Sequence, residues 1–156
     1  MEAHSIRTLV DIRAFPVSRR LPHFNRENLE KSLADVGVRY VWMRELGGYR
    51  KATRAESPNT GLRNQSFRNY ADHMLSAEFK NAAGDLVKLA EQGRTAYMCA
   101  ERVYFRCHRM LVSDYLVLHG HEVQHIDGTG PTKPHKATPE ASLVGEDVIY
   151  RGGQLF

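Results

Sequence analysis

Short apolar runs alternate along this chain with segments in which apolar residues recur every three or four positions. Runs of this kind bounded by polar residues are typical of buried strands, whereas the longer spacing is typical of amphipathic helices. The expected strands are residues 8–12, 38–43, 95–100 and 122–126. The expected helices are residues 26–36, 66–75, 77–91 and 107–119.

Strands that alternate with helices are usually joined by right-handed crossovers and form a parallel sheet. We therefore expect an α/β protein: a single domain whose mostly parallel sheet has helices on both faces, in a Rossmann-like or rhodanese-like topology. Its core should span residues 1–126. Residues 127–156, rich at first in Gly, Pro and Thr, should form an irregular C-terminal extension packed on or draped over that core, with a small strand at Val148–Tyr150.

Two of the expected helices have recognisable capping residues. Asn25 is placed to cap the helix at 26–36, and Gly37 to end it. Ser76 is placed to cap the helix at 77–91. These residues predict where the two helices begin.

Composition narrows the class of protein. Of 156 residues, 42% are hydrophobic and 26% charged, as in an ordinary globular protein. The sequence has no apolar run of membrane-spanning length and no pattern of a secretory signal, and its two cysteines do not make a disulfide scaffold. We expect a cytoplasmic protein with reduced thiols and no membrane association.

The positive charge comes in clusters of arginine. The net charge is +4, and arginines gather near residues 13–26, 50–63 and 102–109. The planar guanidinium fork matches phosphate, which favours a phosphate-bearing partner, either a small molecule or a nucleic acid. A mildly basic, solvated surface would give the same net charge, so both interpretations remain open.

Charged residues follow the strands where each one ends. Asp11 and Arg13 end the first strand, and Glu101 follows the third. Ligands of open parallel sheets bind beyond the carboxyl ends of the strands. We therefore expect Asp11 and Glu101 to lie within hydrogen-bonding or one-water distance of Arg13 or Arg109, as a pair of acid–base or nucleophilic carboxylates.

The segment MCAERVYFRCHRM, residues 98–110, contains both cysteines. Cys99 lies in an apolar strand and should be a buried hydrophobe. Cys107 is expected in the first turn of a helix, where the helix dipole and nearby arginines would lower the pKa of a thiol. Reactivity and simple packing both remain open for Cys107.

Three other chemistries are not supported by the spacing in this segment. The Cys-x5-Arg signature of rhodaneses and cysteine phosphatases fails by one position, because Arg106 comes one residue late. The paired spacing of zinc sites and the Cys-x-x-Cys motif of redox pairs are both absent from the sequence. We therefore predict no metal and no cofactor, and an anion site formed by amides at the helix start with Arg106 and Arg109.

Five stretches also resemble a known family. LVDIRAFPVSRR (9–20), PHFN (22–25), the Leu46-Gly-Gly turn, FRNYADHM (67–74) and MCAE…CHR (98–109) are similar to the domain-of-unknown-function family 488. The resemblance implies an α/β fold and names no substrate. The site positions it implies are Asp11, Arg13, Ser18, Arg19, Asn25, Tyr70, Glu101, Cys107, His108 and Arg109.

Members of that family typically begin with a further strand and helix, whereas only EAHSIR precedes LVDIR here. A sheet edge left exposed in this way would favour pairing with a second copy or with the chain's own C-terminal segment. A homodimer is therefore one expectation.

Three function classes remain after these comparisons. The first is an enzyme, a hydrolase or transferase, that acts on a nucleotide, a nucleic acid or another phosphate-bearing compound. In it Asp11, Glu101, Cys107 and Tyr70 are the catalytic candidates, and the arginines bind the phosphate. The second is a non-catalytic nucleic-acid-binding module with arginines interleaved among aromatic residues. The third is a thiol or redox protein centred on Cys107.

Overall fold

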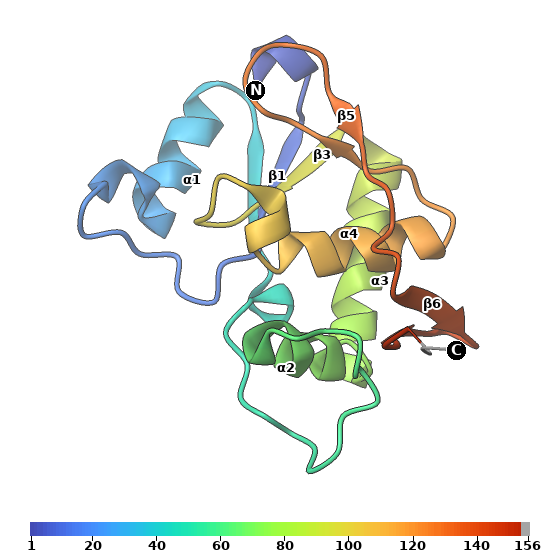
Figure 1. Cartoon of the computed structure of the whole chain (residues 1–156). Coiled ribbons are helices and arrows are strands. Elements are labelled where there is room, and N and C mark those ends of the chain that lie inside the picture. The colour runs from blue at the N-terminus through green and yellow to red at the C-terminus, as the bar shows by residue number, and fades with distance from the viewer. Residues whose placement is uncertain (154–156) are drawn as a thin grey trace. The chain divides into compact units, whose positions relative to one another are not determined.

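The parallel sheet has three strands. The computed structural model describes residues 1–153. In it β1 (Thr8–Asp11), β2 (Arg39–Trp42) and β3 (Thr95–Met98) run parallel in the order β2-β1-β3 (Figure 1). In the central strand β1, Val10 pairs with Val41 on one side and with Tyr97 on the other. The first and third strands along the chain are therefore neighbours in the sheet.

The fourth expected strand was wrongly placed in this sheet. β4 is only Gln124–His125 and pairs antiparallel with β5 (Lys133–Pro134). β6 (Ala141–Val144) and β7 (Asp147–Tyr150) form a second antiparallel pair, which confirms the small terminal strand. β6 and β7 pair with each other and not with an edge of the parallel sheet. The protein is therefore an α/β chain with one three-stranded parallel sheet and two small antiparallel sheets.

The four α-helices lie close to their expected positions. They are α1 (Arg26–Asp35), α2 (Gln65–His73), α3 (Ala77–Gln92) and α4 (Arg109–Leu118). Four short 3₁₀ helices accompany them, η1 (Glu2–His4), η2 (Pro22–Phe24), η3 (Arg44–Leu46) and η4 (Tyr104–Arg106). None of the helices in the described part of the chain is long and apolar enough to cross a membrane.

Local sequence explains several of the helix ends. Ser76 Oγ accepts a hydrogen bond from the Phe79 amide at 3.2 Å, as a capping residue should. Gly37 follows α1 with φ of 75°, and Gly120 follows α4 with φ of 88°. Residues with a Cβ rarely adopt such angles, so glycine ends both helices at low cost.

The chain divides into two compact units, each built from two separate stretches. The first unit contains Met1–Gly47 and Asn81–Ala100, and the second contains Gly48–Lys80 and the chain from Glu101 on. The domain boundary expected at residue 126 falls inside the second unit. In the first unit, α1 covers one face of the parallel sheet, because Leu9, Leu33 and Val38 form a buried cluster there.

The second unit is built around aromatic residues and α4. Tyr70 of α2 and Phe79 are fully buried, with ring centroids 6.0 Å apart, edge to face. Helix α4 packs against α2 and β7. It buries Leu111 and Val112 completely together with two polar residues, Ser113 and Asp114.

Candidate functional site

Asp11 and Arg13 form a buried ion pair at the carboxyl end of β1. Asp11 is the last residue of the strand and is fully buried, while Arg13 is 6% exposed. Nε of Arg13 donates to both carboxylate oxygens, at 2.9 and 3.1 Å, and Nη2 donates to Oδ2 at 2.6 Å. These hydrogen bonds raise the pKa of Arg13 above its usual value, so the guanidinium stays charged. The expected contact between Asp11 and Arg13 is present.

Two aromatic residues of β2 complete this arrangement. Tyr40 donates its hydroxyl to Asp11 Oδ2 at 2.5 Å, and burial, followed by the contact with Asp11, raises the pKa of the phenol. Trp42 donates its indole N–H to the main-chain oxygen of Arg13 at 2.9 Å. The guanidinium carbon of Arg26 lies over the Trp42 ring, 4.6 Å from its centroid, within the range of a cation–π interaction. Both the side chain and the backbone of Arg13 are therefore held in place.

The hydrogen bonds leave Asp11 and Arg13 in different situations. Asp11 accepts from the Arg13 side chain, from the Arg13 amide at 3.1 Å and from Tyr40, so both of its oxygens are engaged. The Arg13 side chain uses Nε and Nη2 for Asp11, and no residue in 1–153 accepts a hydrogen bond from its Nη1. The geometry suits Asp11 for orienting Arg13 and leaves Nη1 of Arg13 for another acceptor.

The other predicted site residues of the first unit lie in the loop between β1 and α1 or at its end. Asn25 stands at the start of α1, but its side chain does not cap the helix as expected. Its Oδ1 instead accepts from the Ser18 amide at 2.6 Å, and Ser18 Oγ accepts from the Leu21 amide at 3.1 Å. Ser18 and Asn25 thus close the loop on itself, because the side-chain oxygen of Asn25 accepts from the Ser18 amide and not from an amide of the helix. Arg19 is exposed on the loop.

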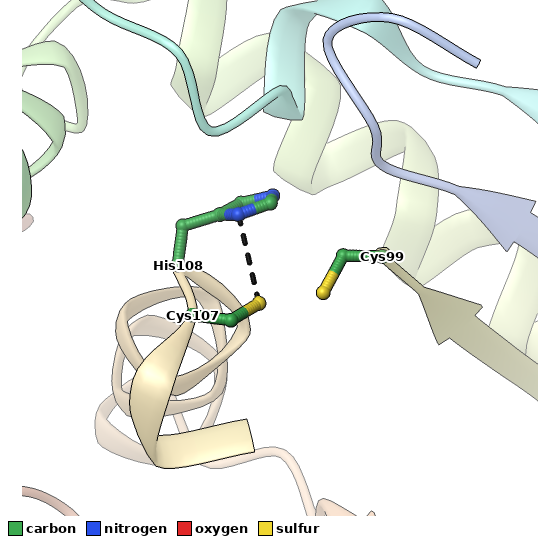
Figure 2. A group of neighbouring side chains, drawn as sticks. All are labelled: Cys99, Cys107 and His108. Carbon is green, nitrogen blue, oxygen red and sulfur yellow. Dashed lines mark hydrogen bonds between the residues drawn. The ribbon is translucent and has the colours of Figure 1, made fainter. Parts of the chain in front are cut away.

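In the second unit, Cys107 and His108 lie side by side just before α4 (Figure 2). The helix begins at Arg109, two residues later than expected, and the sulfur of Cys107 accepts from the Arg109 amide at 3.2 Å. Nδ1 of His108 lies 3.7 Å from the same sulfur. Cys107 is therefore a buried thiol, 6% exposed, between a helix-start amide and an imidazole.

Cys99 directly follows β3 in the first unit and is half-buried rather than fully buried, so the expected burial is incomplete. Cys99 and Cys107 are both free cysteines. Cys107 and His108 are residue types that bind zinc, but they offer only two ligand atoms within their unit. We assign no metal site to them.

The two arginines expected at the anion site, Arg106 and Arg109, differ in exposure and in hydrogen bonding. Arg106 is exposed, whereas Arg109 Nη2 donates to the main-chain oxygens of Glu101 and, at 3.0 Å, of Arg102. Arg109 thus contacts the backbone of Glu101. Glu101 is exposed in the second unit and Asp11 is buried in the first. Their predicted convergence stays a prediction.

Tyr70 supports His108 from within the core. The Tyr70 ring is fully buried, and its centroid lies 5.1 Å from that of His108. On the Gly48 side the imidazole is packed so closely that a Cβ on Gly48 would lie 2.3 Å from Nδ1. The position of His108 thus depends on a glycine that lies far from it in the sequence.

Replacing Gly48 by alanine is expected to displace the His108 ring and to lower the free energy of unfolding by about 1–3 kcal/mol, the usual cost of overpacking. Gly84→Ala is the matched control, since nothing lies within 4 Å of a Cβ at that position in α3. That control should gain about 0.5–1 kcal/mol from helix propensity. Urea unfolding followed by circular dichroism measures both changes, and equal effects would contradict the role of Gly48.

A buried group of hydrogen-bonded side chains around Asp114 was not predicted from the sequence. In the second unit Asp114, fully buried in α4, accepts from Nε2 of His135 at 2.7 Å, from the Thr138 amide at 2.9 Å and from the Tyr150 hydroxyl at 2.8 Å. Nδ1 of His135 lies 2.8 Å from Nε2 of His125. The Tyr104 ring stacks on the His125 ring with centroids 3.5 Å apart. The signal that could have revealed it is an aspartate in the apolar run of α4.

The stability of the protein should fall at acidic pH, because folding keeps His125 neutral where the unfolded chain would be protonated. Burial, with smaller contributions from His135 and Arg109, lowers the pKa of His125 to about 4. The unfolded chain, with a histidine pKa of about 6.5, takes up this proton first, so the free energy of unfolding should decrease as the pH falls from about 6.5 toward 4. The variant His125→Phe keeps a ring against Tyr104 and cannot be protonated. Its unfolding free energy should depend less on pH than that of the wild type, and identical slopes in urea titrations would contradict the assignment.

The class of protein that these observations define is an α/β chain with a parallel three-stranded sheet and a buried Asp–Arg pair at its carboxyl edge. The family "Domain of unknown function DUF488" matches residues 1–116. The chain belongs to this family, and the resemblance noted from its motifs is confirmed. No curated protein and no solved structure matches the chain.

Proposed function

We propose that this protein is an enzyme of the hydrolase or transferase type that acts on a nucleotide, a nucleic acid or another phosphate-bearing substrate, and that Arg13 binds a phosphate oxygen. The observation that carries the proposal is that Arg13 is a buried, charged side chain with a donor left over for a ligand. Arg13 is charged and only 6% exposed, and Nη1 of its guanidinium has no acceptor among residues 1–153. Arginine binds phosphate through such donors.

The position of Arg13 in the sheet supports the same proposal. The strand order β2-β1-β3 means that the chain leaves β1 toward one side and later returns to the other. Ligands of doubly wound sheets bind outside the carboxyl ends of the strands at this kind of switch point. We propose that the topology is Rossmann-like, with helices on both faces, and that Arg13 binds the ligand there.

Asp11 has a positioning role in this proposal. Both of its oxygens are engaged with Arg13 and Tyr40, so it fixes the direction of the guanidinium. Glu101, Cys107 and Tyr70 remain the candidate catalytic residues, and Ser18, Arg19, Asn25, Arg106, His108 and Arg109 the candidate binding residues. We also propose a cytoplasmic location, a homodimer and a reaction that needs neither metal nor cofactor.

Trp42 provides a direct test, because it is the only tryptophan of the chain and its indole is bonded to the Arg13 backbone. Each nucleoside 5′-monophosphate is titrated while Trp42 fluorescence is followed, with the nucleoside as the control. A change with the nucleotide and none with the nucleoside is expected. If no nucleotide changes the fluorescence and none protects the protein against heat, phosphate binding at Arg13 is refuted.

Chromatography of the same mixtures tests for catalysis. Release of inorganic phosphate or of the free base would show phosphoester or glycosidic cleavage. Saturable binding of nucleotides and of single-stranded oligonucleotides, with no product after long incubation, would instead support a non-catalytic nucleic-acid-binding module.

A second candidate function is thiol chemistry at Cys107. The observation in its favour is that the sulfur accepts the first amide of α4 and lies 3.7 Å from Nδ1 of His108. If Cys107 is a nucleophile, its proton passes to His108 and its sulfur bonds to an electrophilic atom of the substrate. The bond from that atom to the leaving group then breaks, and His108 returns the proton to the leaving group. Iodoacetamide labelling at neutral pH compares the variants Cys99→Ser and Cys107→Ser, each of which retains one thiol. Because Cys107 is buried, we expect slow labelling, and fast labelling that His108→Asn abolishes would favour the thiol function.

A further inference from the structure

We propose that the loop of residues 14–24 binds single-stranded nucleic acid, with bases stacked on Phe15 and phosphates bound by the neighbouring arginines. This inference rests on the proposed function and specifies its substrate class. We call this segment the aromatic–basic loop. It follows Arg13 directly and ends at the start of α1, within the first unit.

The loop exposes apolar side chains that most proteins bury. Phe15 is 66% exposed and Phe24 is 38% exposed, and two aliphatic residues, Val17 and Leu21, are 67% and 48% exposed. Isolated exposed apolar residues are common, but a group of them on one loop indicates a binding surface. Flat aromatic rings can stack on any base, so they bind single strands with little sequence preference.

The charge of the loop and its flanks fits a polyanion. Residues 12–26 contain Arg13, Arg19, Arg20 and Arg26 and no aspartate or glutamate. Arg19 and Arg20 are exposed between the apolar residues. Arginines interleaved with aromatic rings are typical of surfaces that follow a single strand, whereas a duplex would hide its bases from Phe15.

Hydrogen bonds within the loop and to α1 hold the exposed residues in a defined conformation. Besides the bonds between Ser18, Asn25 and Leu21, the Arg26 amide donates to the oxygen of Pro16 at 2.9 Å. Asn28 Nδ2 donates to the oxygen of Pro22 at 2.8 Å. The loop therefore presents its rings in a fixed conformation, which lowers the entropy that binding would cost.

The loop is also next to the proposed phosphate ligand Arg13. A single residue, Ala14, separates Arg13 from Phe15. Arg26, at the far end of the loop, lies over Trp42, whose indole is bonded to the Arg13 backbone. A strand bound on the loop could place one of its phosphates at Arg13, so the loop supplies affinity for a polymer that a mononucleotide cannot use.

Fluorescence anisotropy with a labelled oligothymidylate of twelve nucleotides tests the inference. The variant is Phe15→Ala, and the matched control is Val17→Ala, which removes an equally exposed apolar side chain without a ring. Phe15→Ala should weaken binding by about 5- to 150-fold, the range for loss of one stacked base, while Val17→Ala should change it less than about twofold. Arg19→Gln should reduce the salt dependence of binding, as expected for loss of one phosphate contact.

The outcomes separate this inference from the proposed function. If Phe15→Ala and Val17→Ala bind the oligonucleotide equally well, or if the protein binds only mononucleotides, the inference is refuted while the role of Arg13 stands. If no mononucleotide changes Trp42 fluorescence and none protects the protein against heat, phosphate binding at Arg13 fails on its own, whatever the loop variants show. Binding to anionic phospholipid vesicles, lost equally in both variants and without oligonucleotide binding, would mean that the loop is a membrane contact. Because both residues are exposed, both variants should keep the wild-type thermal unfolding temperature, which controls for folding.

Discussion

Replacing Asp114 by alanine is expected to lower the free energy of unfolding by about 3–5 kcal/mol, because several buried donors lose their acceptor at once and each such loss costs about 1–3 kcal/mol. Asp114 is fully buried and accepts hydrogen bonds from His135, Thr138 and Tyr150. Without it, these donors are left in the interior, and the C-terminal segment loses its hydrogen bonds to the Asp114 side chain of α4. Urea unfolding followed by circular dichroism measures the loss.

Asp85→Ala is the matched control for this change. Asp85 also lies within a helix, α3, but it is exposed and pairs with Lys88 on the surface at 3.6 Å. Both substitutions gain the helix propensity of alanine, so their difference reports burial and hydrogen bonding. The control should change stability by less than about 1 kcal/mol. Equal effects of the two substitutions would show that Asp114 is not the attachment point.

Replacing Asp11 by asparagine is expected to have the second large effect. It leaves the charge of Arg13 buried without its counter-ion, which should lower the free energy of unfolding by about 3–5 kcal/mol. The guanidinium also loses the carboxylate that orients it, so nucleotide binding should weaken in the molecules that remain folded. The same substitution at Asp35, exposed at the end of α1, is the control and should leave both properties within error. Wild-type stability of Asp11→Asn would contradict the importance of the pair.

The sequence predicted the elements whose signals are local. The capping serine before α3 and the glycines after α1 and α4 act on their nearest neighbours, so their positions mark the helix ends. The apolar runs of β1, β2 and β3 are likewise local signals, because polar residues bound each run. The fourth run looked similar but pairs with Lys133–Pro134, because strand pairing depends on which segment arrives beside it and not on the run itself.

The sequence predicted those contacts of the candidate site that join residues close together in the chain. Asp11 and Arg13 are two residues apart, so strand geometry places them on the same side of the chain. Tyr40, which contacts Asp11, comes from another strand, and the residues that contact Asp114 come from the chain after β5. The sequence around Asp11 and Asp114 therefore gives no signal for these contacts. Asn25 has a capping residue's position but bonds to Ser18, because tertiary contacts compete with local capping.

The central claim, that Arg13 anchors a phosphate, is tested most directly by comparing Arg13→Lys with Arg39→Lys. Both substitutions keep the positive charge and remove the guanidinium fork. Arg39 is exposed at the opposite end of the same sheet, where it pairs with Thr8, so its replacement controls for charge and fold. The measurement is the dissociation constant of each nucleoside 5′-monophosphate from Trp42 fluorescence, with thermal unfolding to confirm the fold. We predict at least a tenfold loss of affinity for Arg13→Lys and less than a twofold change for Arg39→Lys, and equal affinities in the two variants would contradict the claim.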